Sequence, residues 1–497
     1  MQFPLPSGDN MAEERSLQKN KVGLWAMAFL TVAAIYPMAM AVSNAAAAVT
    51  FGGFAAPLIP ILGALLILLA TIPILEYSRI ASFAGGYYGL AEIGFGKAVG
   101  KFVAMENLFY FISFDVLTST AFAYVIYSSL TYVTSYVLPV SLFISISIIF
   151  MFAMFLVTVL DLSISAKAVI FSGILQIIVL VIYSLIVILR SPYNSLEAFN
   201  PSVAPGGLSG LFLGVILAGF LFYTGYGVPL FFAEEGKAPF KDVWKAIVVG
   251  VIIPTVVGVL AIYSEVVAVG LSHASKLSSE LSPGLAAYLP YLGIPAAIFF
   301  ILVALLGQGF GGFVPGMTTA RLIYSMGRDK FFKSDWITKV SRRGIPVNAA
   351  IINLILGIVA TALDEGLMIH FYGLSQGAFD ALFLSGSMAV AFWFIHHIIP
   401  DISLAFYLRK KGIKILKLRS FITSILAPAG AVILFVYSFY EGYSSLTEPY
   451  FGGLLFVLVS MVVVAIYVAI KHARNTLGMS YVERTISEEK LRAEFKD

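Results

Sequence analysis

The stretch LSGLFLGVILAGFLFYTGYGVPLFFAEEGKAP, residues 208–239, is an apolar segment long enough to cross a bilayer, yet Gly225, Gly227 and Pro229 interrupt it near its middle. A helix that is broken inside lipid leaves backbone N–H and C=O groups without partners. Such a break persists only where protein, water or a bound solute takes up those groups. We therefore predict a binding site at membrane depth around this break.

The composition of the whole chain is that of a polytopic, all-α membrane protein. Of the 497 residues, 60% are hydrophobic and 12% are charged, against about 25% charged in soluble domains, and the mean hydropathy is +0.94. The sequence predicts twelve transmembrane helices, since each needs about 20 apolar residues. They lie at residues 23–49, 56–78, 101–127, 138–160, 166–190, 208–233, 241–269, 294–326, 346–363, 374–406, 419–441 and 450–471.

The basic residues predict the orientation of this bundle in the cell membrane. With a cytoplasmic N-terminus, only Arg190 and Lys276 of the 31 Lys and Arg residues lie on the outer side, as the positive-inside rule requires. The tails, residues 1–22 and 472–497, are then both cytoplasmic, and the second, being short and mixed in charge, is expected to be a solvated end. Because topology accounts for the net charge of +4, no nucleic-acid partner is expected.

Several function classes lack their motifs. The chain has no cysteine, and its five histidines have no metal-ligand spacing, so we expect no disulfide and no metal site. It has no G-x-x-x-x-G-K-[ST] motif, so ATP-driven transport by this chain alone is not expected. No polar cluster that could serve an enzyme assembles from these spacings, and we expect no catalytic residue and no cofactor. The first span is too long for a signal-peptide core and is expected to stay in the protein.

A second interruption lies in the first span, where Pro37 follows the first twelve residues of WAMAFLTVAAIYPMAMAVSNAAAA, residues 25–48. Proline removes a backbone donor and pushes Tyr36 out of helical geometry. Broken helices that open two five-span halves indicate an inverted-repeat transporter with its substrate between the breaks. The predicted single domain, residues 23–471, then divides into repeats 23–190 and 208–406 and two extra helices within 419–471. The alternative is that Pro37 only kinks a spanning helix.

Four stretches resemble the amino acid–polyamine–organocation superfamily of permeases. They are FYTGYGVPLFFAEEGKAPFKDVWKAI at 222–247, FAGGYYGLAEIGFGKAVGKF at 83–102, DLSISAKAVIF at 161–171 and TTARLIYSMGRDKFF at 318–332, and their order and spacing match across the chain. The resemblance implies a LeuT-like fold with discontinuous first and sixth spans. It also implies secondary active transport of amino acids by alternating access.

The chain departs from the family pattern in three places. Ala39, Met40 and Ala41 stand where many members have Gly-Ser-Gly-Ile, and Gly227 stands where many have Glu. Gln176 aligns with a lysine that replaces sodium in some proton-coupled members, so no lysine cation is available there.

The chemistry of a zwitterionic amino acid selects the residues at the two breaks as candidate binding residues. Free N–H groups at Ala39 to Ala41 suit the carboxylate, and carbonyls from Phe220 to Thr224 suit the ammonium. Tyr223 and Tyr226 either close over the substrate as an aromatic gate or only pack. The full set of candidates is Pro37, Met38, Ala39, Met40, Ala41, Ser43, Phe220, Tyr223, Thr224, Gly225 and Tyr226.

Two intramembrane carboxylates are candidates for coupling to a proton gradient, because a buried charge in lipid is costly and by default functional. Asp115 lies about 20 Å along its helix from Lys101 at 1.5 Å per residue. It either titrates, faces a cationic substrate, or is hydrogen-bonded to Ser119 or Thr118. Asp380 raises the same question.

Other polar residues allow a different ion or a proton relay. Thr318 and Thr319 stand where sodium-coupled relatives supply hydroxyl ligands, so a sodium site is an alternative. Of His396 and His397, at most one can face a translocation path, because adjacent side chains on a helix diverge by about 100°.

The sequence thus predicts a monomeric or weakly oligomeric amino acid permease in the lipid bilayer, with proton symport as the preferred mode. The alternatives are an amino acid exchanger, a transporter of polyamines or other amines, a nutrient receptor and a channel.

Overall fold

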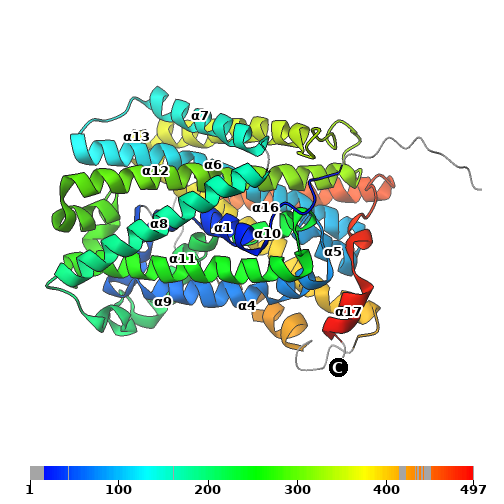
Figure 1. The fold of residues 1–497 in the computed structure, drawn as a ribbon, viewed down its shortest axis with the longest axis horizontal. Coiled ribbons are helices and arrows are strands. Elements are labelled where there is room, and N and C mark those ends of the chain that lie inside the picture. Colours follow the sequence, from blue (N-terminus) through cyan, green and yellow to red (C-terminus); the bar gives the residue numbers. More distant parts are fainter. Residues whose placement is uncertain are drawn as a thin grey trace, which may run out of the picture.

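The computed structural model describes residues 16–42, 44–160, 162–413, parts of 421–440, and 449–495. Long helices run side by side along one direction (Figure 1). The described part of the chain is helical and forms no β-strand, although two isolated bridges pair Val22 with Gly236 and Ala81 with Ile486. The expectation of an all-α protein is confirmed.

The α-helices have the following bounds: α1 Leu24–Ile35, α2 Pro37–Val42, α3 Asn44–Gly52, α4 Leu58–Ile80, α5 Tyr87–Phe95, α6 Lys97–Thr134, α7 Val140–Thr158, α8 Leu162–Arg190, α9 Gly207–Gly214, α10 Val228–Phe231, α11 Pro239–Val269, α12 Pro283–Arg328, α13 Val347–Lys410, α16 Tyr450–Ala473 and α17 Glu488–Phe495. Short 3-10 helices are η1 Gly53–Ala55, η2 Leu196–Phe199, η3 Pro201–Val203, η5 Leu221–Tyr223, η6 Ala233–Glu235, η7 Ala274–Ser279 and η9 Val482–Thr485, and π-helical turns are η4 Val215–Gly219 and η8 Ile422–Leu426.

Among the described residues, nine helical segments are long and apolar enough to cross a membrane. Their outward faces carry large apolar side chains that no protein covers, for example Leu65, Ile149, Phe171, Leu302 and Val463, each more than half exposed. A soluble protein would bury such side chains, whereas a lipid bilayer is a suitable surrounding for them. The chain is therefore built as a multi-pass membrane protein.

The two longest of these helices, α12 and α13, are each interrupted by a glycine with positive φ. Gly293 (φ 77°) divides α12, one residue before the predicted start of the eighth span, and Gly373 (φ 75°) divides α13 between the predicted ninth and tenth spans. The predicted end of the ninth span at residue 363 is too early. The acidic residues that follow end the apolar run, yet Glu365 is buried and accepts hydrogen bonds from Thr120 (2.9 Å) and Ser147 (2.5 Å).

The two interruptions of the first and sixth apolar segments have distinct geometries. At the first, α1 ends at Ile35, Tyr36 adopts the left-handed conformation (φ 53°, ψ 82°) and Pro37 begins α2. This confirms that Pro37 excludes Tyr36 from helical geometry. At the second, α9 passes through η4 and η5, and residues 224–227 separate these from α10, with Gly225 at φ +97°.

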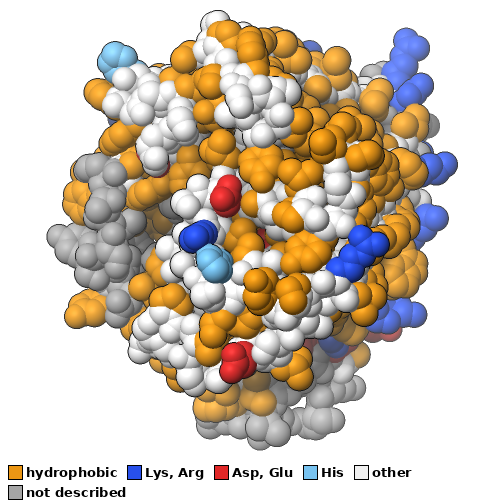
Figure 2. Space-filling view, turned by 90° about the vertical axis from the view of Figure 1, so that its left-hand side faces the viewer, with side chains coloured by type: hydrophobic (Ala, Val, Ile, Leu, Met, Phe, Trp, Pro, Cys, Tyr) orange, Lys and Arg blue, Asp and Glu red, His pale blue; other side chains and the backbone are white. Residues whose placement is uncertain are grey.

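Residues 16–22, residues 329–345 and the C-terminal segment, residues 476–495, lie at one end of the bundle. We call this end the tail end. It lies on the right in Figure 1, where α5, α17 and the C-terminus are grouped. Figure 2 views the opposite end, where charged side chains stand as separate spots in a largely hydrophobic and uncharged surface. Arg190 lies at this opposite end and donates to the carbonyl of Tyr291 at 2.9 Å.

The C-terminal segment is not a solvated end, and this expectation was wrong. Val482 is fully buried and Leu491 is 2% exposed, so the segment packs onto the tail end by apolar anchors. The charged composition of the segment did not reveal these buried residues, because they are single apolar residues spaced among charged ones.

A buried ion pair joins the sixth segment to α12 near the tail end. Nε and Nη2 of Arg321 both contact the carboxylate of Glu235, with Nη2 to Oε1 at 2.9 Å, and both side chains are at most 3% exposed. Removing one partner of such a pair leaves an uncompensated buried charge.

We predict that Arg321→Met lowers the stability of the bundle by about 3–5 kcal/mol. The double variant Glu235→Gln/Arg321→Met recovers part of that loss, because it removes the stranded carboxylate. The midpoint of thermal unfolding in detergent measures both effects. As a control, Lys330→Met breaks the exposed contact of Lys330 with Asp335 (3.8 Å) and changes stability by less than about 1 kcal/mol. Equal midpoints for Arg321→Met and Lys330→Met would contradict the prediction.

Candidate functional site

A small cavity lies where the two helix breaks meet. Its volume is about 50 Å³, so it holds only a few water-sized groups. It is lined by Ala34, Ile35, Tyr36, Ala39, Asn44, Phe114, Leu117, Thr118, Ala121, Leu221, Thr224, Gln308, Gly311, Gly312 and Leu382. The wall thus combines both breaks with α6, α12 and α13.

Neighbouring helices take up the polar groups of the first break. The hydroxyl of Tyr36 donates to the carbonyl of Ala304 on α12 at 2.6 Å, and the N–H of Met38 donates to Oε1 of Gln176 on α8 at 3.4 Å. Gln176 in turn donates to the carbonyl of Ser172 at 3.3 Å. The amide at the position of the family lysine therefore binds the broken backbone directly.

The expectation that the N–H of Ala39 is free needs correction. It donates to the carbonyl of Tyr36 at 2.9 Å, because α2 restarts the helical hydrogen-bond pattern immediately after the break. Ala39 still lines the cavity. Met38 and Ala41 belong to an apolar cluster, and the side chain of Met40 packs against Gly258. Pro37 is buried at the start of α2, and Ser43 lies outside the described residues.

The second break is held by aromatic side chains. The N–H of Gly225 donates to the hydroxyl of Tyr110 at 2.9 Å, and a Cβ at Gly225 would lie 2.8 Å from the Phe114 ring. A Cβ at Gly227 would lie 1.6 Å from the hydroxyl of Tyr87. The departure from the family's glutamate has a steric reason, because Tyr87 occupies the space that a side chain at Gly227 would need.

The aromatic candidates at this break point away from the cavity. Tyr223 donates to the carbonyl of Pro60 at 2.6 Å and lies 2.9 Å from the hydroxyl of Thr255. The hydroxyl of Tyr226 contacts Nε2 of His397. Phe220 packs on Trp393 with a ring distance of 5.5 Å. In this conformation Thr224 lines the cavity, and the aromatic residues that line it are Tyr36 and Phe114.

Asp115 is fully buried, and among the described residues neither carboxylate oxygen has a hydrogen bond of standard geometry. Asn353 and Thr319 lie beside it. The hydroxyl of Thr118 instead donates to the backbone carbonyl of Asp115 at 3.1 Å, and that of Ser119 lies 3.1 Å from the hydroxyl of Thr361. On α6, Phe114 and Thr118 face the cavity, and Asp115 faces α12 and α13.

Like Asp115, the other candidate ion-coupling residues do not line the cavity. Asp380 accepts hydrogen bonds from Gln376 (2.8 Å) and from Tyr450 on α16 (3.0 Å). Thr318 and Thr319 donate to carbonyls one turn back in α12, at 2.8 and 2.9 Å, which leaves their oxygen lone pairs available to a ligand. Both His396 and His397 are fully buried among aromatic rings, and Nδ1 of His397 lies 3.4 Å from Asp401.

Sequence reasoning missed most of the cavity residues, among them Tyr36, Thr118 and Gln308. Gln308 donates to the carbonyl of Thr118 at 2.9 Å and is the polar residue of the run LLGQGFGG, residues 305–312. A lone amide in an apolar span is the signal that could have found it, because such a group needs a partner within the bundle. Which face of its helix Thr118 occupies was not readable from composition.

Comparison with known proteins shows what the sequence is similar to. A family model described as amino acid permease matches residues 22–465. The chain is also 28% identical over 173 residues to the glutamate/serine transporter AimA of Bacillus subtilis (strain 168). That similarity spans 33% of this chain and 31% of the relative.

We predict that Gly311→Ala destabilises the bundle by about 1–3 kcal/mol, as overpacking does. A Cβ there would lie 2.4 Å from the carbonyl oxygen of Ala33, a backbone atom that cannot rotate away. Gly309 on the same helix is the matched control, because the nearest atom to its Cβ, on Phe122, is 4.0 Å away. Gly309→Ala is expected to be neutral or to stabilise the helix by up to about 1 kcal/mol. Equal unfolding midpoints for the two variants would refute the close contact of α1 and α12.

Proposed function

Because the chain belongs to the amino acid permease family, we propose that it is a proton-coupled secondary transporter of small neutral amino acids in the cell membrane. The observation that carries this proposal is the cavity formed where both helix breaks meet. Broken helices present backbone dipoles to a zwitterion without placing a full charge in the bilayer.

The wall of the cavity supports a neutral side chain as substrate. Its lining residues include no Asp, Glu, Lys or Arg among those the structure describes, and its polar side chains are uncharged, for example Tyr36, Thr224 and Gln308. A polyamine would bring several ammonium groups into this cavity without carboxylate partners, and a glutamate side chain would find no cation there. Of the two amino acids in the name of the Bacillus subtilis relative, serine therefore fits better than glutamate.

For the architecture we propose twelve crossings with the N- and C-termini, and hence the tail end, in the cytoplasm. Residues 23–190 and 208–406 form the two inverted repeats, and residues 419–471 contribute the last two helices. The glycine breaks at Gly293 and Gly373 support this count, because each splits one continuous helix into a membrane-length part and a second part.

Transport then proceeds by movement of the two broken segments against α6, α8, α12 and α13. The breaks at Tyr36 and Gly225 act as hinges, because both residues have positive φ and depart from helical backbone geometry. At the tail end, the sixth segment is held to α12 by the pairs Glu235–Arg321 and Glu234–Arg328. Opening toward the cytoplasm separates these surfaces.

Asp115 is the proposed proton site, since among the described residues its buried carboxyl has no hydrogen bond of standard geometry, with Asn353 and Thr319 beside it. A proton on this group neutralises the charge at membrane depth. Sodium at Thr318 and Thr319 is the alternative ion. Amino acid exchange is a second candidate mode, favoured by the observation that Asp115 does not line the cavity, because exchange needs no coupling ion.

The test is uptake of labelled amino acids into liposomes that contain the purified protein. An inward proton gradient is expected to drive accumulation of serine or alanine above equilibrium, with lower uptake of glutamate and of putrescine. Uptake only into preloaded vesicles would replace symport by exchange. The absence of saturable uptake for every amino acid would refute the substrate class.

Asp115→Asn is expected to lower proton-driven accumulation at least tenfold and to retain exchange in preloaded vesicles. Asp380→Asn is the matched control, because this second buried carboxylate has Gln376 and Tyr450 as partners and is expected to keep accumulation. Full accumulation by Asp115→Asn would exclude Asp115 as the proton site.

A further inference from the structure

Residues 476–495, which we call the strap, cross the tail end as a backbone-bonded segment. The N–H of Ser487 donates to the carbonyl of Ile80 at 2.8 Å, and the N–H of Ser82 donates to the carbonyl of Thr485 at 3.3 Å. Between these bonds Ala81 and Ile486 form an antiparallel bridge. The strap thus adds a short strand-like pairing to the end of α4.

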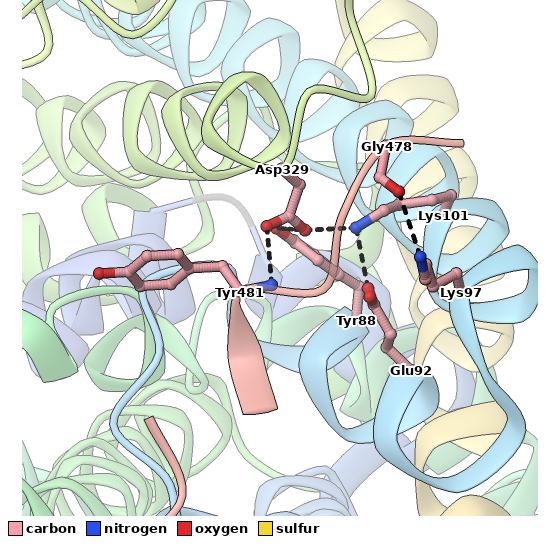
Figure 3. A network of polar contacts seen from close by, with 7 residues as sticks. All are labelled: Tyr88, Glu92, Lys97, Lys101, Asp329, Gly478 and Tyr481. Carbon is pink, nitrogen blue, oxygen red and sulfur yellow. Dashed lines mark hydrogen bonds and ion pairs between the residues drawn. The ribbon is translucent and has the colours of Figure 1, made fainter. Parts of the chain in front are cut away.

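A second set of bonds seats the strap on the end of α12 (Figure 3). The carbonyl of Asp329 accepts from the N–H of Met479 at 2.7 Å, and its carboxylate accepts from the N–H of Tyr481 at 3.2 Å. The other carboxylate oxygen pairs with Lys101 and accepts from the hydroxyl of Tyr88 at 3.1 Å. Lys101 also pairs with Glu92 at 2.9 Å.

This ion network is buried, since the side chains of Lys101, Asp329 and Glu92 are at most 1% exposed. A buried charge cluster is costly unless every member is partnered. The strap contributes one of those partners, the N–H of Tyr481. Docking of the strap therefore adds to the partners of the ion network that the bundle itself provides.

The strap also reaches the sixth segment through one arginine. The ring of Tyr481 lies 3.6 Å from the guanidinium of Arg328, which binds both carboxylate oxygens of Glu234 at 2.7 Å each. Glu234 belongs to η6 and accepts from the N–H of Ala84 at 2.8 Å. Stacking on an aromatic face restricts the planar guanidinium, so Tyr481 holds Arg328 in the orientation that Glu234 requires.

A cavity of about 400 Å³ borders this contact. Its wall includes Glu234 and Arg328, Tyr324 of α12, and Met479, Tyr481 and Arg484 of the strap. The strap therefore forms one wall of this cavity, and the end of the sixth segment forms another.

We propose that the strap is part of the inner gate: it holds Arg328 against Glu234 while the tail end is closed and must release for solute to leave there. This inference rests on the proposed transport function, because alternating access requires the sixth segment to separate from α12 at this end. Tyr481 is in this sense a positioning residue, since it acts on Glu234 through Arg328.

A reversible disulfide between the strap and α4 tests the proposal. Ala81 and Ile486 have the hydrogen-bond pattern of a non-hydrogen-bonded antiparallel pair, whose Cα atoms lie about 4.5 Å apart, within the range of about 4.4–6.8 Å that a disulfide spans. The chain has no cysteine, so Ala81→Cys/Ile486→Cys forms this bond without competitors.

Oxidation of the double variant is expected to lower amino acid exchange in proteoliposomes at least tenfold, and a reductant is expected to restore it. The single variants Ala81→Cys and Ile486→Cys are the controls, and neither should respond to oxidation or reduction. Loss of the two free thiols on oxidation verifies the bond. Equal exchange rates with the disulfide formed and reduced would overturn the proposal.

A second measurement does not depend on any substrate. Ser325 lies on the face of α12 between Arg321 and Arg328, and its side chain is fully buried, so Ser325→Cys reports opening of the tail end to a membrane-impermeant maleimide. Tyr481→Ala is expected to raise the labelling rate at least fivefold. Tyr136→Ala, an exposed tyrosine after α6, should leave it unchanged.

An unchanged labelling rate in Tyr481→Ala would refute the role of the strap even where transport is intact. Conversely, if the parent protein transports no amino acid, the proposed function fails, and the labelling rate still decides whether the strap controls access.

Discussion

Every backbone polar group at membrane depth needs a partner, and this constraint shapes the centre of the molecule. Two segments abandon helical geometry inside the bundle, and other helices supply what they lose. Gln176 from α8 accepts from the first break, and Tyr110 from α6 accepts from the second. Because these partners come from helices outside the broken pair, the breaks are tied to the surrounding bundle and cannot form without it.

Close approach at glycine makes this arrangement possible. A side chain at Gly311 would collide with the backbone of α1, and one at Gly227 would collide with Tyr87. Small residues at helix interfaces allow backbones to pack closely in lipid, where no hydrophobic force drives helices together. The cavity is small and uncharged for the same reason, since tightly packed backbone and neutral side chains line it.

Charge is concentrated at the tail end, where several buried charged side chains form ion pairs. Arg321 and Arg328 on α12 hold the two successive glutamates of η6, and Lys101 and Asp329 connect α6 to α12. The C-terminal segment joins this network through backbone N–H groups and through the ring of Tyr481. The sixth segment and the C-terminal segment thus share the same contacts.

Hydropathy and proline placement were sufficient to predict much of the fold. The all-helical bundle, the departure of Tyr36 from helical geometry and the position of the break before Pro229 follow from local rules on apolar length and on proline. The ninth span was predicted too short, because an apolar window cannot show that Glu365 would find Thr120 and Ser147 on other helices. Of the candidate binding residues, Thr224 and Ala39 line the cavity, whereas Tyr223 and Tyr226 turn away from it.

The amino-acid order alone thus determined the membrane class of the protein, the places where its helices break and the family to which its motifs belong. These properties depend on residues close together in the chain. The tertiary structure decided which side chains meet at the breaks, that Gln308 and Thr118 face the cavity while Asp115 faces α12 and α13, and that the C-terminal segment docks. Each of these depends on the rotation of one helix against another, and that rotation is set by long-range packing and pairing that no local pattern encodes.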